Sequence, residues 1–180
     1  KLVVGVENMP YKNILEPLLG NTLLNFGGTV STRGTQNNRE VFEMNNGTKV
    51  APIICYESIY GEYVTEYVRN GAQFLAIITN DGWWSESQGY KQHLSYAKIR
   101  SIETRRSIAR SANTGSSAII NKKGEIVNQL DYNTKGIING KINLSDELTF
   151  YVKYGDFIYR FSLFFFLIII LFSFTKKKKY

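Results

Sequence analysis

The feature that most limits what this chain can fold into is an apolar stretch of about 19 residues near its C-terminus, from Phe157 to Thr175. Its interruptions are Arg160, Ser162 and Ser173. A helix of roughly 20 apolar residues spans the hydrocarbon core of a bilayer. A helix in the core of a soluble protein is usually shorter and has a polar face. Residues 157–175 are therefore expected to form one transmembrane helix.

The residues that flank this stretch indicate its orientation. Four lysines, Lys176 to Lys179, follow it directly. Lysines beside a span mark its cytoplasmic end, so residues 176–180 are expected to form a cytoplasmic basic tail. Residues 1–156 would then lie on the other side of the membrane, and Arg160 can extend its guanidinium to the interface. The alternatives to a span are a C-terminal anchor signal that is later cleaved and a buried hairpin.

The charge and length of the chain limit its function classes. The net charge is +7, and four of the positive charges are the lysines of the tail. The remaining excess of positive charge is spread along the chain. No basic block alternates with aromatic residues, which argues against a nucleic-acid site. The length fits one soluble domain of about 150 residues and one helix. Because the chain begins Lys-Leu-Val-Val without a signal peptide, we expect it to be the C-terminal piece of a longer membrane protein.

Cys55 is the only cysteine, which excludes an intramolecular disulfide and a Cys-based metal cluster. It ends the short apolar run Val50-Ala-Pro-Ile-Ile-Cys55, and the residues after it have a helical pattern. A turn between a strand and a helix exposes a side chain beside free backbone N–H groups, which suits a nucleophile. The alternative is a buried cysteine that packs as a small apolar side chain.

Apolar patterns and turn signals predict an α/β layer fold, because strands and helices alternate before a run of strands. The predicted strands are Arg39–Met44, Thr48–Cys55, Phe74–Thr79, Ile108–Ser111, Ser117–Asn121, Ile126–Leu130 and Ile137–Ile142. The predicted helices are Asn13–Leu19, Ser58–Arg69 and Tyr90–Thr104, with a loop at Asn80–Trp84. The continuous apolar run Phe74–Thr79 is typical of a strand that is covered on both faces.

Several motifs have the order and spacing found in the apolipoprotein N-acyltransferases, a family of the nitrilase (carbon–nitrogen hydrolase) superfamily. They are Ile54-Cys55-Tyr56-Glu57, Thr79-Asn80-Asp81-Gly82-Trp83, Gln92-His93, Arg100-Ser101-Ile102-Glu103 and Arg110-Ser111-Ala112-Asn113-Thr114-Gly115. The chain resembles this family over about residues 1–175. The resemblance implies that residues 1–156 are the C-terminal part of a nitrilase-like α-β-β-α sandwich, a catalytic domain facing the periplasm of a bacterial inner-membrane protein.

The resemblance also implies roles for particular residues. The superfamily uses a Cys to attack a carbonyl, a Glu to move protons and a Lys to hold the oxyanion. Cys55 would be the nucleophile, and its thiol needs a base or a positive field to become a thiolate. Glu57 would support the active site, with a helix-start carboxylate as the alternative. Glu7, in Leu2-Val3-Val4-Gly5-Val6-Glu7, would lie on a loop over the site, with an exposed loop charge as the alternative.

By the same resemblance, Trp83 would line the lipid entrance and Tyr56 would bind substrate. Trp83 could equally be an interfacial anchor, and Trp84 is expected to be an anchor only. The family's catalytic Lys would lie two residues before Lys1, and its catalytic Glu further upstream. Both are therefore expected outside these 180 residues.

Other polar residues are given structural roles. His93, the only histidine, lies in a predicted helix and has no chemical role in the motif. Glu103 and Arg106 are spaced as an i, i+3 pair near the end of that helix. Asn80 and Asp81 either shape the loop beside the nucleophile or form an ordinary turn.

The function implied is transfer of a fatty acyl chain from a phospholipid to the N-terminal amine of a lipoprotein's diacylglyceryl-cysteine. The reaction would be ping-pong through a Cys55 thioester, with no metal and no organic cofactor, in a monomer at the bilayer. One alternative is a nitrilase-type amidohydrolase, in which water replaces the amine. Another is an inactive fragment or a membrane-tethered binding domain.

Overall fold

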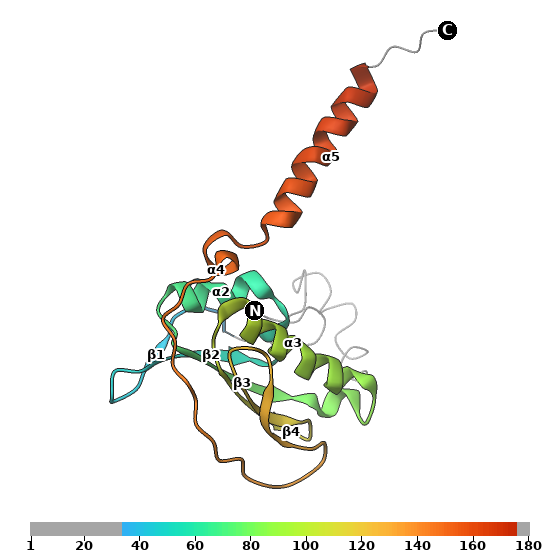
Figure 1. Cartoon of the computed structure of the whole chain (residues 1–180). Coiled ribbons are helices and arrows are strands. Elements are labelled where there is room, and N and C mark those ends of the chain that lie inside the picture. The colour runs from blue at the N-terminus through green and yellow to red at the C-terminus, as the bar shows by residue number, and fades with distance from the viewer. Residues whose placement is uncertain (1–33, 176–180) are drawn as a thin grey trace.

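The computed structural model describes residues 34–175 (Figure 1). Glu7 and the helix predicted at Asn13–Leu19 lie outside the described residues. The strands are β1 (Phe42–Glu43), β2 (Lys49–Ile54), β3 (Phe74–Asn80), β4 (Ile108–Asn113), β5 (Ser117–Ile120) and β6 (Ile126–Leu130). The α-helices are α2 (Gly61–Arg69), α3 (Gln88–Thr104), α4 (Phe150–Tyr154) and α5 (Phe157–Thr175). Two short 3₁₀ helices, η1 (Cys55–Ile59) and η2 (Asp81–Trp84), follow β2 and β3.

The described strands form one sheet in the order β1-β2-β3-β4-β5-β6. The central strands β2, β3 and β4 are parallel, whereas β1, β5 and β6 pair antiparallel with their neighbours. α2 joins β2 to β3, and α3 joins β3 to β4. Successive right-handed crossovers that step in one direction put both helices on one face of the sheet, as Figure 1 shows. The carboxyl ends of the parallel strands meet at one edge, where ligands bind in open α/β sheets.

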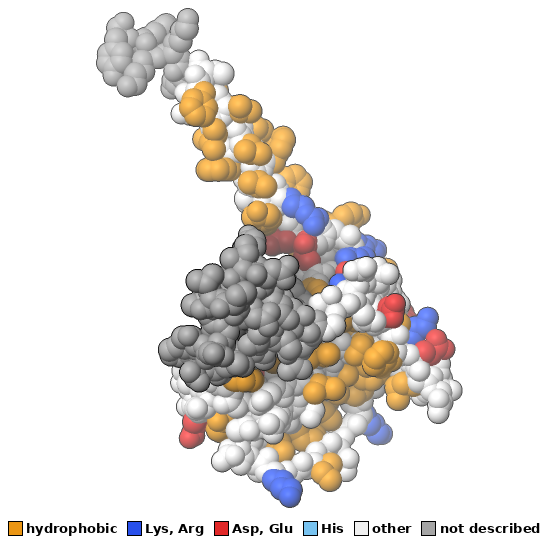
Figure 2. Space-filling model, turned by 180° about the vertical axis from the view of Figure 1, so that it is seen from behind, with side chains coloured by type: hydrophobic (Ala, Val, Ile, Leu, Met, Phe, Trp, Pro, Cys, Tyr) orange, Lys and Arg blue, Asp and Glu red, His pale blue; other side chains and the backbone are white. Residues whose placement is uncertain are grey.

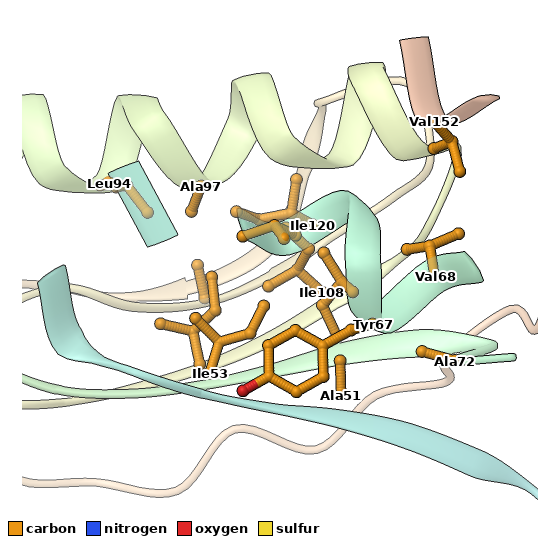
Figure 3. Packing of buried hydrophobic residues seen from close by; sticks show 14 residues of the cluster. Ala51, Ile53, Tyr67, Val68, Ala72, Leu94, Ala97, Ile108, Ile120 and Val152 are labelled. Carbon is orange, nitrogen blue, oxygen red and sulfur yellow. The ribbon is translucent and has the colours of Figure 1, made fainter. Parts of the chain in front are cut away.

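The hydrophobic core lies between the sheet and these two helices (Figure 3). The strands contribute Ala51, Ile53, Leu75, Ile77, Ile108, Ala118 and Ile120, and the helices contribute Val64, Tyr67, Val68, Leu94, Ala97 and Val152. Full burial of one such aliphatic side chain stabilises the fold by about 1.5–3 kcal/mol. The spacing of the α2 residues is that of one face of a helix, so α2 is amphipathic.

In the sequence, Leu94, Ala97 and Ile102 are expected to form an apolar stripe on this helix. Leu94 and Ala97 are buried, but Ile102 is 44% exposed, and the buried face of α3 is partly polar. His93, Arg100 and the last residues of the helix occupy the buried face instead. Of these, His93 near the start of α3 lies at the carboxyl edge of the sheet, where it contacts Asp81 and the Cys55 carbonyl.

Within residues 34–175, the other face of the sheet is only partly covered. Ile54 and Ile78, which are neighbours in the sheet, are 63% and 64% exposed. A groove of about 550 Å³ separates this face from the irregular segment 136–142. Apolar side chains gather on the domain and along α5 in the view from behind (Figure 2). Within the described residues, β3 is thus covered on one face rather than on the two that its apolar run predicts.

Three predicted elements differ from the structure, and the first, the strand predicted at Arg39–Met44, is reduced to the two residues of β1. The strand predicted at Ile137–Ile142 is wrong, because this backbone joins no sheet and is held by a hydrogen bond of 2.9 Å from Asn128 Nδ2 to Asn139 O. The helix predicted to begin at Ser58 begins at Gly61, after the 3₁₀ turn η1. Apolar residues that face a sheet without pairing give the same sequence pattern as a strand.

The predicted Glu103–Arg106 pair is also wrong. Glu103 pairs with Arg100, whose Nη2 lies 3.2 Å from Glu103 Oε1. The buried Arg106 donates instead to the backbone oxygens of Ala72 and Glu147, each at 2.7 Å. Arg106 therefore ties the end of α3 to the segment that leads to α4.

α5 projects from the domain, and none of its 19 residues is buried (Figure 1). By length and composition, it is the one helix in the described part of the chain that could cross a membrane. Its first turn is fastened to α2, because Arg160 Nη2 and the Asp156 N–H both reach Glu62 Oε1 at 2.7 Å. Gly155, with a φ of +66°, separates α4 from α5. The direction of α5 is therefore set by contacts at its base.

Candidate active site

Cys55 stands directly after β2, as the first residue of η1. Its φ is +51°, a conformation that costs a non-glycine residue about 1–3 kcal/mol. The side chain is partly exposed. This is the turn between strand and helix that the sequence predicts, and the strained backbone turns the thiol toward the carboxyl edge of the sheet in the manner of a nucleophile elbow.

Hydrogen bonds hold this turn on both sides. The Cys55 carbonyl accepts from Ser58 Oγ at 2.9 Å and lies 3.2 Å from His93 Nε2. The buried Glu57 accepts from the Ile54 N–H at 2.9 Å and from the Tyr63 hydroxyl. Such contacts compensate the cost of a strained residue at a functional site.

Glu57 is therefore part of a second layer beneath the turn. The Tyr63 hydroxyl, which donates to Glu57, accepts from Arg39 Nη1 at 2.8 Å. The Arg39 guanidinium also lies over the Tyr63 ring, 4.4 Å from its centroid. Burial, together with the hydrogen bond to Glu57, raises the pKa of Tyr63. Tyr63 thus stays protonated and donates to Glu57. Glu57 lies in the first turn of η1, which is the helix-start position given above as the alternative to an active-site role.

The sulfur of Cys55 has a polar neighbour on the next strand. Thr79 Oγ1 lies 3.2 Å from Cys55 Sγ and 3.0 Å from Asp81 Oδ1. A hydroxyl carries one hydrogen, so Thr79 can donate to one of these two atoms at a time.

Asp81 is the centre of a buried charged cluster. Its Oδ1 lies 2.9 Å from His93 Nδ1 and its Oδ2 lies 2.6 Å from Arg110 Nη2. Burial alone would raise the pKa of Asp81, but the hydrogen bonds and charges of His93 and Arg110 lower it overall. An ionised carboxylate only accepts, so His93 carries a proton on Nδ1. Gly115 lies so close that an added Cβ would collide with Asp81.

This cluster brings three of the sequence motifs together, and its contacts with Cys55 add a fourth. Sequence reasoning gave Asp81 a turn or loop role and left Arg110 without one. The only histidine was expected to be structural, and its contacts with Asp81 and the Cys55 carbonyl fit a residue that holds the turn. The signal that could have found the cluster is the presence of a carboxylate, a histidine and an arginine in three of the motifs.

The predicted substrate-binding residues flank the turn. The half-buried Tyr56 has its ring centroid 6.2 Å from Tyr60 and 6.3 Å from His93. Trp83 is 68% exposed on η2, at the same edge of the sheet. Trp84 is turned inward, with its ring 5.2 Å from that of His93, so it packs against the protein rather than serving as the expected anchor. Within residues 34–175, no three His, Cys, Asp or Glu side chains are grouped as a metal site.

Comparison with known proteins identifies the family. Residues 8–148 match the family model described as carbon-nitrogen hydrolase. The chain belongs to the carbon–nitrogen hydrolase family. The carbon–nitrogen hydrolase of Helicobacter pylori G27 has a similar crystal structure, with a TM-score of 0.53 at 12% identity over 59% of this chain and 44% of that one. This likeness shows a nitrilase-like α/β fold, as the sequence predicts.

Two curated relatives of this carbon–nitrogen hydrolase are named apolipoprotein N-acyltransferase. That of Chlorobaculum tepidum is 34% identical over 161 residues, which are 88% of this chain and 30% of the relative. That of Bradyrhizobium diazoefficiens is 36% identical over 157 residues, which are 86% of this chain and 28% of the relative. The chain thus spans about 30% of the length of the curated relatives it matches.

Proposed function

We propose that this carbon–nitrogen hydrolase is the C-terminal part of a membrane-bound acyltransferase. It would move a fatty acyl chain from a phospholipid to the N-terminal amine of a diacylglyceryl-cysteine lipoprotein. The observation that carries the proposal is Cys55, a strained and partly exposed thiol at the carboxyl edge of parallel strands. The names of the curated relatives support the choice of acyl transfer.

The first half-reaction would load the acyl chain onto Cys55. The thiolate attacks the ester carbonyl of the phospholipid, and the backbone N–H groups at the start of η1 can donate to the oxyanion. The intermediate collapses as the C–O bond breaks, and the departing alkoxide takes up a proton. The products are a Cys55 thioester and a lysophospholipid.

The second half-reaction would transfer the chain to the acceptor. The lipoprotein amine attacks the thioester carbonyl, the C–S bond breaks, and the electron pair returns to sulfur. Loss of a proton from nitrogen completes the amide. No step in this ping-pong scheme needs a metal or an organic cofactor.

The general base and a second oxyanion donor would come from the part of the protein that precedes this chain. Within residues 34–175, the hydrogen bond to Cys55 Sγ comes from Thr79, which is not basic enough to remove the thiol proton. The coverage of about 30% of the relatives' length supports this division. Glu7, Glu57, Tyr56 and Trp83 keep the supporting roles that the family resemblance implies.

The proposed location is the bacterial inner membrane. α5 would span the bilayer, with the lysine tail in the cytoplasm and residues 1–156 in the periplasm, because lysines mark the cytoplasmic end of a span. The exposed aromatic residues Phe150, Tyr154 and Tyr159 surround the base of α5, and tyrosine is common at the membrane interface. This placement would bring the site to the phospholipid surface.

The test is intact-mass analysis of the full-length protein that carries this chain, supplied with phospholipid but no acceptor. We expect an acyl adduct that neutral hydroxylamine removes and that Cys55→Ala lacks. Ser95→Ala, an exposed change on α3, should keep the adduct and serves as the control. An adduct of the same size in Cys55→Ala would rule out Cys55 as the nucleophile.

An amidohydrolase would share every step up to the acyl-enzyme and then use water. α5 argues against this alternative, since a soluble amidase needs no bilayer. The two can be separated by adding a diacylglyceryl-cysteine peptide to the acyl-enzyme. An N-acylated peptide supports the acyltransferase, whereas free fatty acid formed at the same rate with and without peptide supports the hydrolase.

A further inference from the structure

We propose that the Thr79 hydroxyl is the hydrogen-bond donor to the Cys55 thiolate, and that the buried Asp81–His93–Arg110 cluster holds Thr79 in place for this purpose. The proposal rests on the proposed function, because it takes Cys55 to be the nucleophile. Thr79 would touch the reacting sulfur, whereas Asp81, His93 and Arg110 would be positioning residues.

The sheet register places Thr79 beside the nucleophile. Ile54 and Ile78 are partners in the parallel ladder of β2 and β3, so the next residues along these strands, Cys55 and Thr79, are neighbours too. The side chain of Thr79 lies on the face that Leu75 and Ile77 fill with apolar groups, and it is 5% exposed. A buried hydroxyl needs partners, and its two partners are Cys55 Sγ and Asp81 Oδ1.

Asp81 Oδ1 is a second acceptor for the Thr79 hydroxyl. With a neutral thiol, the Cys55 S–H can donate to Thr79 Oγ1 while the Thr79 O–H donates to Asp81. When a general-base carboxylate outside the described residues removes the thiol proton, the Thr79 O–H turns to the thiolate. Asp81 keeps its hydrogen bond from His93 and its ion pair with Arg110. The carboxylate is therefore not left unpaired in either state.

The same rotation would accompany both half-reactions. Formation of the C–S bond removes the negative charge from sulfur, and the Thr79 O–H returns to Asp81. Cleavage of that bond in the second half-reaction restores the thiolate, and Thr79 donates to it again. A hydrogen bond to a charged group is stronger than one to a neutral group, so Thr79 favours the thiolate both as nucleophile and as leaving group.

The cluster is suited to fix Thr79 in place. Within residues 34–175, the charged or titratable groups around the turn are Tyr56 and Glu57 on η1, Tyr63 on α2 with its partner Arg39, Asp81 on η2, His93 on α3 and Arg110 on β4. His93 also lies 3.0 Å from Ser58 Oγ and 3.2 Å from the Cys55 carbonyl. One side chain thus contacts both the backbone of the nucleophile and the carboxylate that holds Thr79.

The test measures alkylation of Cys55 by iodoacetamide in the full-length protein, from about pH 6 to pH 10, by peptide mass spectrometry. This reaction needs no phospholipid, so it reports on Thr79 even if Cys55 never carries an acyl chain. We expect Thr79→Val to raise the pH midpoint by about one unit and to slow alkylation at pH 7 about tenfold. Thr79→Ser, which keeps the hydroxyl, should stay close to the wild-type midpoint.

Thr104→Val is the matched control, because Thr104 is a buried threonine on α3 whose hydroxyl donates to Arg100 O at 2.7 Å. It should lower stability without moving the midpoint. If Thr79→Val does not fold, Thr79→Ala removes the same hydrogen bond with less crowding. An unchanged midpoint in the valine or alanine variant, or an equal shift in Thr79→Ser, would overturn the proposal. If the intact-mass experiment described above shows no acyl adduct on Cys55 while Thr79→Val still shifts the alkylation midpoint, only the proposed function is overturned.

Discussion

At the scale of single residues, Cys55 is both the proposed nucleophile and a strained position of the backbone. Its φ of +51° suits glycine, which avoids the cost of about 1–2 kcal/mol that a side chain meets in the left-handed region. We expect Cys55→Gly to be more stable than Cys55→Ala by about 1 kcal/mol while both lack the thiol. Urea unfolding followed by tryptophan fluorescence measures the difference. A lower midpoint for the glycine variant would contradict the idea of strain.

Asp81 should make the stability of the domain sensitive to acid. Because the pKa of Asp81 is lowered in the folded protein, its ion pairs contribute in full above the pKa of an unfolded aspartate, about 3.9. That contribution is lost as pH falls through the lower folded value. Unfolding free energy of the wild type should therefore decline below about pH 4.

The matching variant is Asp81→Asn, which removes the titrating group. At neutral pH we expect it to lose about 3–5 kcal/mol, because His93 and Arg110 are left buried beside a neutral amide. Its stability should depend less on pH in the acid range. Asp146→Asn, at an exposed carboxylate that bonds Gln73, should cost less than 1 kcal/mol. If the unfolding free energies of wild type and Asp81→Asn declined equally with falling pH, the assignment of this acid sensitivity to Asp81 would be refuted.

The residues of the site were only partly predictable. The turn at Cys55 followed from local signals, namely a short apolar run, a lone thiol and the helical pattern after it. The contact between Asp81 and Arg110 joins residues 29 positions apart, and no local pattern encodes such a distance. The inward position of Trp84 likewise depends on His93, which another element supplies.

At the scale of elements, Gly155 decides how α5 leaves the domain. Its φ is +66°, and an added Cβ would collide with the Glu62 carboxylate that fastens the base of α5. We expect Gly155→Ala to break the contacts of Glu62 with Asp156 and Arg160, and so to free α5 from α2. Limited proteolysis in detergent should then cut residues 155–160 several-fold faster. Gly34→Ala, where an added Cβ meets no atom, should leave the cutting rate unchanged, and equal rates in the two variants would contradict the role of Gly155.

Regular elements with a strong pattern were predicted well, and short ones were not. β2, β3, α3 and α5 lie within a few residues of their predicted bounds, because each has a long apolar run or a helical period. α4 was missed, since its five residues give too short a pattern. The local features that bound α4 are the Thr149 hydroxyl, which accepts from the Val152 N–H at its start, and Gly155, whose φ is positive, at its end.

At the scale of the whole molecule, the proposed topology makes a direct prediction. An alkaline phosphatase fused after Asp156 should be active, because this enzyme matures only outside the cytoplasm, and one fused after Tyr180 should be inactive. Replacing Lys176 to Lys179 with neutral residues in the second fusion should raise its activity, because the lysines set the orientation. The reverse pattern in the first two fusions would refute both the orientation and the periplasmic assignment.

The described sheet has a spatial order that repeats the order of its strands along the chain. Each strand pairs with the one made just before it, so the contacts of the sheet are nearly as local as a parallel sheet allows. A polypeptide that emerges from a translocation channel N-terminus first could therefore add one strand at a time to a growing edge. Asp81 and His93 would be in place before Arg110 arrives on β4, so the buried carboxylate would gain its guanidinium partner only when the fourth strand docks.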